Sequence, residues 1–223
     1  MTLSWLRTFL GFQRSTSSSQ PQAQPKGPDR SPSPTTPQPV TTSSRPASSV
    51  QTLPTEHGLY SPGFHRAYRA TRSYEGGASN DPDDPGGQTY AGISRRAHPE
   101  WAGWTLIDQG APPEKLEPLV ESFYWSLWKQ YRLDDVPVDI APKLFDCIFA
   151  LGPSVLRQLQ HTLGIAETGV MDAQTIEALR RADPARVLAH LRFLQAYVYA
   201  KFVSMRPDRR MKFLRGLMLR AVA

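Results

Sequence analysis

The chain has almost no cysteine and few candidate metal ligands. A single cysteine, Cys147, leaves no pair for an internal disulfide, so the fold cannot depend on a disulfide framework. The five histidines are scattered without the spacing of metal ligands, which argues against a zinc amidase or peptidase. No glycine-rich phosphate-binding loop is present either. We therefore expect neither a metal nor a cofactor.

Long apolar runs are also missing. The N-terminal stretch Met1–Phe12 is too short to span a bilayer, no basic residue precedes its apolar part, and Arg7 interrupts it. A signal peptide is therefore not expected. Leu3, Leu6 and Phe9 share one helical side, so residues 1–14 are predicted to be a short amphipathic segment. Such a segment is either a frayed tail or a docking peptide for a membrane surface or a partner.

Residues 15–57 are composed mostly of Ser, Thr, Pro, Gln and Ala. A stretch of this composition cannot bury enough apolar surface to offset its chain entropy. It is predicted to be a disordered linker, with the folded part beginning at residue 58.

The rest of the chain is predicted to be mainly helical, because apolar residues recur at helical spacing and no alternating strand pattern of useful length appears. Helix-start signals predict helices that begin near Pro112, Pro142, Ser154, Asp183 and Pro207.

A further helix is predicted to end at Glu75. Phe64, Tyr68 and Thr71 lie at helical spacing, and the series continues to Glu75, which should therefore point toward the core. Loss of hydration raises the pKa of a carboxyl group, so this residue suits a general acid. The pair Gly76-Gly77 is expected to end the helix in a left-handed conformation.

The following loop is rich in carboxylates and turn residues. The stretch Asn80–Gly87 has the composition of successive tight turns, and Gln88–Ile93 is predicted to be a short strand or extended piece. A carboxyl group at the helix end and others in the loop can lie in different environments across a cleft. General acid and base catalysis on a glycosidic bond requires such a pair.

These residues resemble a known family. The blocks that carry the resemblance are Glu75-Gly76-Gly77, Asn80-Asp81-Pro82, Asp84-Pro85-Gly86-Gly87, Thr89-Tyr90-Ala91-Gly92-Ile93-Ser94, His98-Pro99-Glu100-Trp101-Ala102-Gly103-Trp104, and Phe123-Tyr124 with Trp128. They are similar to glycoside hydrolase family 108, the N-acetylmuramidases of phage endolysins and bacterial secretion-activator proteins. The resemblance covers roughly residues 60–220.

The resemblance implies an all-helical, lysozyme-like fold with a small loop or hairpin lobe. It implies cleavage of the β-1,4 bond between N-acetylmuramic acid and N-acetylglucosamine in peptidoglycan, with Glu75 as the catalytic acid and Asp84 and Thr89 positioning a water. Residues expected to contact the sugar are Asn80, Asp81, Tyr90, Trp104 and Trp128.

Two regions are predicted within the folded part. Residues 58–145 would form the catalytic region, and residues 146–223 resemble a peptidoglycan-binding domain. Leucines at helical spacing in the second region also fit the core of a single fold, so independent wall binding stays an alternative.

Two other functions stay open. A lytic transglycosylase would cleave the same bond with Glu75 as both acid and base, and a non-catalytic wall-binding or virion protein would not cleave it. We expect a monomer that is made in the bacterial cytoplasm and acts on the wall in the periplasm; the route of export is not encoded in a recognisable signal.

Positive charge is concentrated at the C-terminal end. Residues 176–223 contain 11 basic and 3 acidic residues, within a chain of net charge +6. The basic residues Arg206, Arg209, Arg210, Lys212, Arg215 and Arg220 are expected to attract anionic envelope polymers or lipid headgroups. No aromatic stacking platform or recognition motif accompanies them, so nucleic acid is not an expected partner.

Overall fold

The structure is a computed structural model that describes residues 60–80 and 87–223. The predictions for residues 1–14 and 15–57, and those for Asp81 and Asp84, lie outside the described residues. The described residues belong to one compact unit. No helix among them is long and apolar enough to cross a membrane.

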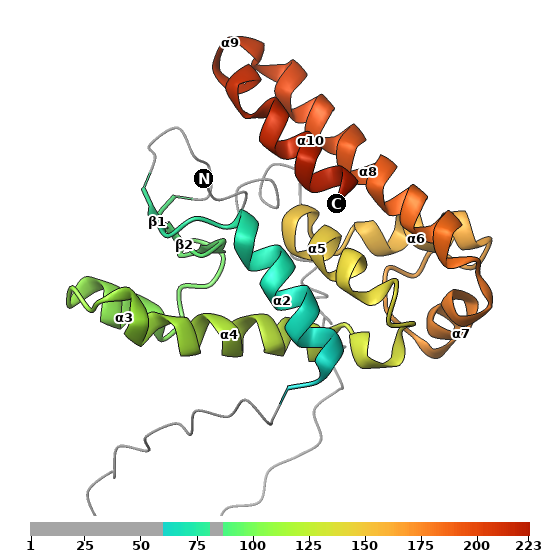
Figure 1. Cartoon of the computed structure of the whole chain (residues 1–223), viewed down its shortest axis with the longest axis horizontal. Coiled ribbons are helices and arrows are strands. Elements are labelled where there is room, and N and C mark those ends of the chain that lie inside the picture. Colours follow the sequence, from blue (N-terminus) through green and yellow to red (C-terminus); the bar gives the residue numbers. More distant parts are fainter. Residues whose placement is uncertain (1–59, 81–86) are drawn as a thin grey trace, which may run out of the picture. The chain divides into compact units, whose positions relative to one another are not determined.

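The described chain is mainly helical, as predicted (Figure 1). Its helices are α2 (Pro62–Tyr74), α3 (Gly103–Asp108), α4 (Pro113–Gln130), α5 (Ala141–Leu151), α6 (Val155–Leu163), α7 (Ala173–Arg181), α8 (Pro184–Met205), α9 (Pro207–Arg210) and α10 (Leu214–Val222). Two short 3₁₀ helices are η1 (Leu133–Asp135) and η2 (Met211–Phe213), and three strands are β1 (Ala78–Ser79), β2 (Thr89–Tyr90) and β3 (Ile93–Ser94).

Helix α2 starts and stops close to where the sequence predicts. The Ser61 side chain accepts a hydrogen bond from the Phe64 backbone N–H at 3.3 Å, and Pro62 occupies the first helical position, where its missing N–H costs nothing. The helix ends because Glu75 adopts an extended backbone, with φ −92° and ψ 126°. The predicted left-handed glycine cap is wrong, since neither Gly76 nor Gly77 has a positive φ.

The small lobe is a three-stranded antiparallel sheet in the order β1-β2-β3. The sequence predicts one strand or extended piece over residues 88–93. The structure differs, because Ala91 and Gly92 turn the chain between β2 and β3. Both residues have positive φ, 47° and 72°, which suits the two-residue turn of a tight hairpin. Tyr90 therefore pairs with Ile93.

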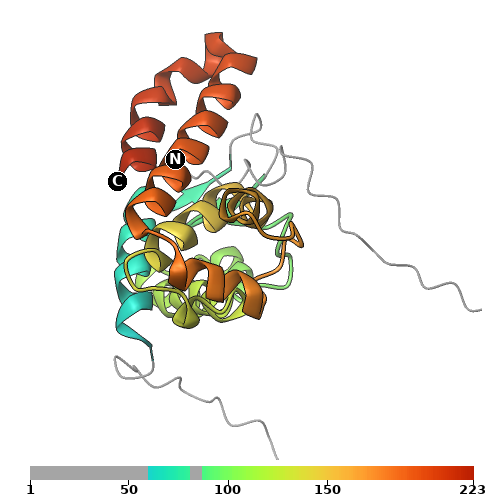
Figure 2. The same ribbon diagram turned by 90° about the vertical axis from the view of Figure 1, so that its right-hand side faces the viewer.

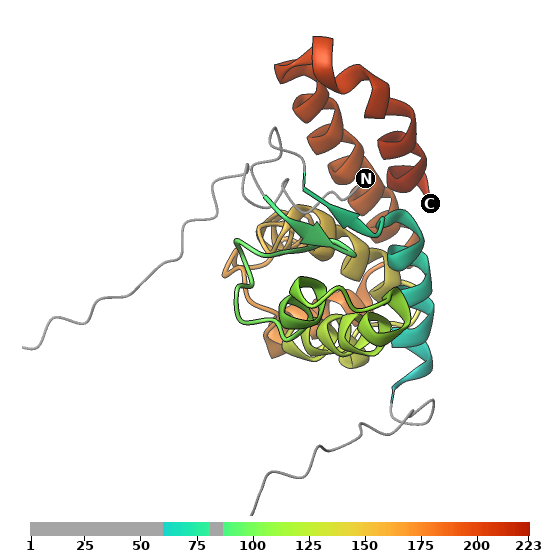
Figure 3. The same ribbon diagram turned by 90° about the vertical axis from the view of Figure 1, so that its left-hand side faces the viewer.

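Helix α5 lies at the centre of the core. Most of its residues are buried, and it packs against α2 and α8 (Figures 1 and 3). The domain boundary predicted between residues 145 and 146 falls inside this helix. A cut there would split a buried element, so the two predicted regions share one core.

The C-terminal part is a helical hairpin. Helix α10 runs back alongside α8 in the opposite direction (Figures 1 and 2). The single helix predicted from Pro207 is wrong, because η2 separates α9 from α10.

Ser154 precedes α6 without a side-chain capping bond, whereas Asp183 caps α8 by accepting from the Ala185 N–H at 3.0 Å.

Candidate active site

Glu75 is buried at the end of α2, with 5% of the residue exposed. Its Oε1 accepts a hydrogen bond from Nη1 of Arg220 at 2.8 Å. Its Oε2 is buried and has no hydrogen-bond partner among the described residues. The Glu75 carbonyl accepts a bond from Nη1 of Arg72 at 2.7 Å, which holds the backbone at the helix end. The two carboxyl oxygens are therefore in different environments.

Gly92 of the hairpin turn packs directly against this carboxyl group. A Cβ atom at position 92 would lie 2.8 Å from Oε2 of Glu75 and 2.7 Å from Cε1 of Phe149. Both distances are shorter than van der Waals contact allows, so no side chain fits there without displacement. Two properties of glycine are therefore needed at this position: its tolerance of a positive φ, and the absence of a side chain beside Oε2.

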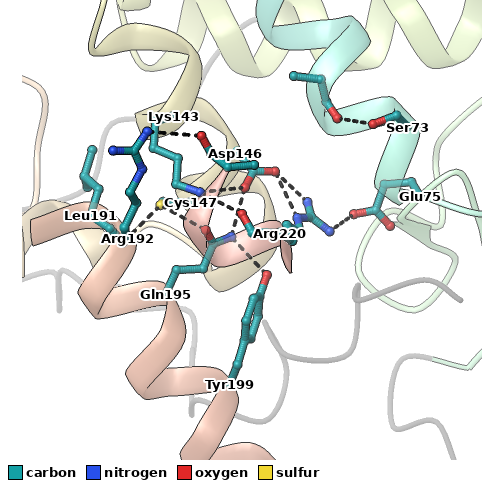
Figure 4. A network of polar contacts seen from close by, with 12 residues as sticks. Ser73, Glu75, Lys143, Asp146, Cys147, Leu191, Arg192, Gln195, Tyr199 and Arg220 are labelled. Atoms are coloured by element: carbon teal, nitrogen blue, oxygen red, sulfur yellow. Dashed lines mark hydrogen bonds and ion pairs between the residues drawn. The ribbon is translucent and has the colours of Figure 1, made fainter. Parts of the chain in front are cut away.

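Arg220 connects Glu75 to a buried polar network (Figure 4). Its Nε and Nη2 donate to Oδ1 of Asp146 at 3.0 and 2.8 Å, while Nη1 donates to Glu75. The other Asp146 oxygen accepts from the Gln195 amide at 2.9 Å, and that amide nitrogen also donates to the Tyr199 hydroxyl at 3.0 Å. One guanidinium thus joins α10 to both α2 and α5.

A lysine balances the second carboxylate. Lys143 Nζ donates to the backbone carbonyl of Arg220 at 2.8 Å and lies 3.9 Å from Oδ2 of Asp146. Burial lowers the pKa of Lys143. Burial also disfavours the charged form of Arg220, but the carboxylates of Asp146 and Glu75 outweigh it and hold the pKa of Arg220 well above its ordinary value. When all four groups are ionised, the cluster carries no net charge.

Tyr124 of α4 is a further buried side chain near Glu75. Its hydroxyl donates to the Ala91 carbonyl at 3.0 Å, which ties α4 to the hairpin turn. Burial, and next the charge of Glu75, raise the pKa of Tyr124 well above its ordinary value. Tyr124 is therefore a neutral hydrogen-bond donor here.

The predicted site residues on the small lobe have different exposures. Thr89 is fully buried on β2, next to Tyr90, which is 6% exposed and stacks on Trp101 with a centroid distance of 6.2 Å. Asn80 follows β1 and is exposed. The Ala91 N–H donates to the Gly77 carbonyl, so the chain just after Glu75 lies beside the hairpin turn.

Two predicted sugar contacts are structural side chains instead. Trp104 and Trp128 are 2% and 1% exposed, and their indole N–H groups donate to the His98 carbonyl at 2.7 Å and to Oδ1 of Asp134 at 2.8 Å. Neither ring presents a face on which a sugar can stack. The sequence argument failed here because a tryptophan in a helix is equally suited to a core and to a sugar site.

Three residues of the site were missed by the sequence reasoning. Arg220 was assigned to the exposed basic surface, but it is 1% exposed. The sequence could have indicated its burial, because Arg220 lies beside Leu217 and Ala221 on one face of α10. A charged residue on an apolar face needs a partner of opposite charge. Asp146 is likewise a charged residue within the apolar run of α5. For Gly92, the sequence indicated only that a glycine favours a turn.

Residues 60–80 and 87–223 contain no group of three His, Cys, Asp or Glu side chains that could hold a metal ion. Cys147 is buried, and burial raises the pKa of its thiol.

Comparison with solved structures gives the fold. The chain is similar to one titled "Structure of Brucella abortus SagA", with a TM-score of 0.54 and 24% identity over 71% of this chain and 93% of that chain. The search of curated proteins found no match. The fold and the buried glutamate beside a small sheet define a mainly helical protein with a lysozyme-like domain.

The family follows from the sequence. Residues 68–152 match the profile of the family described as Glycosyl hydrolase 108, and this range contains Glu75, Gly92 and Asp146. These residues therefore form a glycosyl hydrolase 108 domain, which confirms the resemblance over this range and supports a glycoside hydrolase. Arg220 lies outside the matched range. The likeness of residues 146–223 to a peptidoglycan-binding domain stays a prediction.

Proposed function

We propose that this protein is an N-acetylmuramidase that cleaves the β-1,4 bond between N-acetylmuramic acid and N-acetylglucosamine, with Glu75 as the general acid. The observation that carries the proposal is the position of Glu75. It is buried at a helix end within the family domain, with one carboxyl oxygen bound and the other without a partner among the described residues. When Glu75 is protonated on this second oxygen, the proton is available to the leaving group.

The chemistry requires contact between this oxygen and the substrate. A general acid must come within about 3 Å of the atom that it protonates. Because Oε2 of Glu75 is buried, binding of the glycan has to uncover it. Burial in the free protein keeps water from this oxygen until the substrate arrives.

The test is Glu75→Gln, with the exposed Glu100→Gln as the matched control. An amide cannot donate the required proton, so release of reducing sugar from purified wall should fall by about 10²-fold or more. Glu100→Gln should retain the wild-type rate, because that side chain is 75% exposed. Residual activity of Glu75→Gln above about one hundredth of wild type would remove Glu75 from the acid role.

We also propose that Asp84 and Thr89 position the attacking water. If they do, Asp84→Ala and Thr89→Ala each slow hydrolysis while helical circular dichroism is unchanged. Wild-type rates in both variants would favour the transglycosylase, in which a hydroxyl of the sugar replaces water. Mass spectrometry of the products separates the two reactions, since only transglycosylation leaves anhydro sugar ends. A wild-type protein that binds wall without cleaving it would instead be a wall-binding or virion protein.

The biological setting is also a proposal. We infer an endolysin-like or secretion-activating enzyme that acts as a monomer on the wall in the periplasm. Its exposed basic residues Arg206, Arg209 and Arg215 would bind anionic envelope polymers or lipids. Cosedimentation with anionic vesicles and with purified wall should weaken when all three are replaced by Gln. Sedimentation velocity measures the oligomeric state.

A further inference from the structure

The hydrogen bonds of Arg220 divide one guanidinium between two carboxylates. Two of its nitrogens bind a single oxygen of Asp146, and the third binds Oε1 of Glu75 (Figure 4). Arg220 and Glu75 are 145 positions apart in the chain. The contact therefore exists only because α10 folds back along α8 and brings its end to the end of α2.

We propose that Arg220 is a positioning residue for the reaction: it holds Oε1 of Glu75 so that Oε2 is the oxygen that carries and donates the proton. Asp146 holds the guanidinium in place for this task. The proposal rests on the proposed role of Glu75 as general acid. It assigns a function to a helix that lies outside the range matched by the family profile.

The geometry supports this assignment because the last torsion of a glutamate side chain is soft. Its carboxyl plane has no sharp rotamer preference, so an unrestrained Glu75 would sample several orientations. The bond to Nη1 of Arg220 removes this freedom on one oxygen. On the other side, Gly92 leaves just enough space for Oε2. The guanidinium and the glycine together determine which way the carboxyl group points.

Lysine cannot replace the guanidinium in this task. The planar guanidinium donates in three fixed directions, two toward Asp146 and one toward Glu75, whereas an ammonium is a point charge on a flexible stem. The whole Arg220 side chain is also enclosed, with its guanidinium carbon 5.2 Å from the centre of the Tyr74 ring. A lysine would keep the positive charge but lose the fixed orientation.

Burial argues against a purely stabilising role. Removing two opposite charges from water costs about as much as their attraction returns, so a buried ion pair is a weak source of stability. An apolar side chain of similar size would serve packing as well. An orienting role for Glu75 accounts for an arginine at this position.

Several charged groups and one tyrosine surround Glu75. They are Arg220 on α10, Asp146 and Lys143 on α5, Tyr124 on α4 and Arg72 on α2. Arg220 is bound directly to the Glu75 side chain, whereas Arg72 binds only its backbone carbonyl. Replacement of Arg220 therefore acts on the proposed acid group itself.

The experiment compares Arg220→Lys and the double variant Arg220→Gln/Asp146→Asn with the wild type and with Arg66→Lys. The control residue, Arg66, lies on α2, the helix that ends before Glu75, and it is exposed. For each protein, kcat and KM are measured on solubilised peptidoglycan, and thermal unfolding reports the folded fraction. The double variant removes a cation and its carboxylate partner together, so the charge balance of the buried cluster is kept, and it provides a second test if Arg220→Lys does not fold.

We expect folded Arg220→Lys to lose about tenfold or more in kcat with KM within about twofold, because misplacement of a catalytic group by about 1 Å can cost far more than that. The double variant should also lose kcat, with KM nearly unchanged. Arg66→Lys should match the wild type.

Two results would overturn the proposal: a folded Arg220→Lys with wild-type kcat, or a folded double variant with wild-type kcat. A purely structural role predicts these results, because activity would then fall only in proportion to the unfolded fraction. Failure of the proposed function looks different, because the wild-type protein itself would then not cleave the wall, or Glu75→Gln would retain activity.

Discussion

Replacement of Gly92 by alanine tests the packing of the hairpin turn on Glu75. The new Cβ would meet Phe149 at 2.7 Å and Oε2 of Glu75 at 2.8 Å, at a residue whose φ is +72°. Gly110 provides a matched control, because its φ is also +72° but nothing lies within 4 Å of its Cβ position. Both substitutions therefore cost the free energy of placing an alanine at positive φ, but only Gly92→Ala also creates a steric clash.

The expected magnitudes follow from these two terms. An alanine in the left-handed region costs about 1–2 kcal/mol. The smaller entropy of the unfolded chain returns about 0.4–1 kcal/mol of this. Gly110→Ala should therefore lower the free energy of unfolding by about 1 kcal/mol. Gly92→Ala adds an overpacking term of about 1–3 kcal/mol, because Phe149 is buried and has little room to move. Its total loss should be about 2–4 kcal/mol.

Urea unfolding followed by circular dichroism measures both losses. Hydrolysis of purified wall provides a second readout, since displacement of Oε2 should slow Gly92→Ala even under conditions where it is fully folded. Equal stability losses in the two variants would refute the contact between Gly92 and the Glu75 carboxyl group. A folded Gly92→Ala with the wild-type rate would show that the position of Oε2 is not important for cleavage.

Two further predictions concern stability. Asp172 caps α7 by accepting from the Thr175 N–H at 2.8 Å and the Thr175 hydroxyl at 2.7 Å, so Asp172→Ala should lower the free energy of unfolding by about 1 kcal/mol at neutral pH. The hydrogen bonds from Thr175 hold the pKa of Asp172 in the folded protein below its ordinary value of 3.8. The stabilisation is therefore complete above pH 3.8 and is lost as the pH falls through the lower pKa of the folded protein. A stability difference from wild type that persists undiminished into strong acid would contradict this prediction. Deletion of residues 1–55 should leave the thermal midpoint and the cleavage of purified wall nearly unchanged, because that composition buries little apolar surface. A large fall in the midpoint would place the predicted boundary in the wrong position.

Local patterns in the sequence were sufficient for the helices and for the direction of Glu75. Its place on the stripe of Phe64, Tyr68 and Thr71 depends only on helical periodicity, and the structure buries all four residues. Helix starts at Pro and Asp were predicted for the same reason, since capping is a property of neighbouring residues. The turn at Ala91 was missed because alanine seldom adopts a positive φ.

Contacts between distant segments were decided only by the tertiary structure. The sequence places Arg220 among exposed basic residues, whereas the return of α10 along α8 buries it between Glu75 and Asp146. Trp104 and Trp128 likewise became core residues because α3 and α4 pack their rings inward. Periodicity assigns a side chain to a face of its helix, but the partner of that face depends on how the helices pack. The environment of the proposed acid is therefore a property of the fold, although the acid itself is recognisable in the sequence.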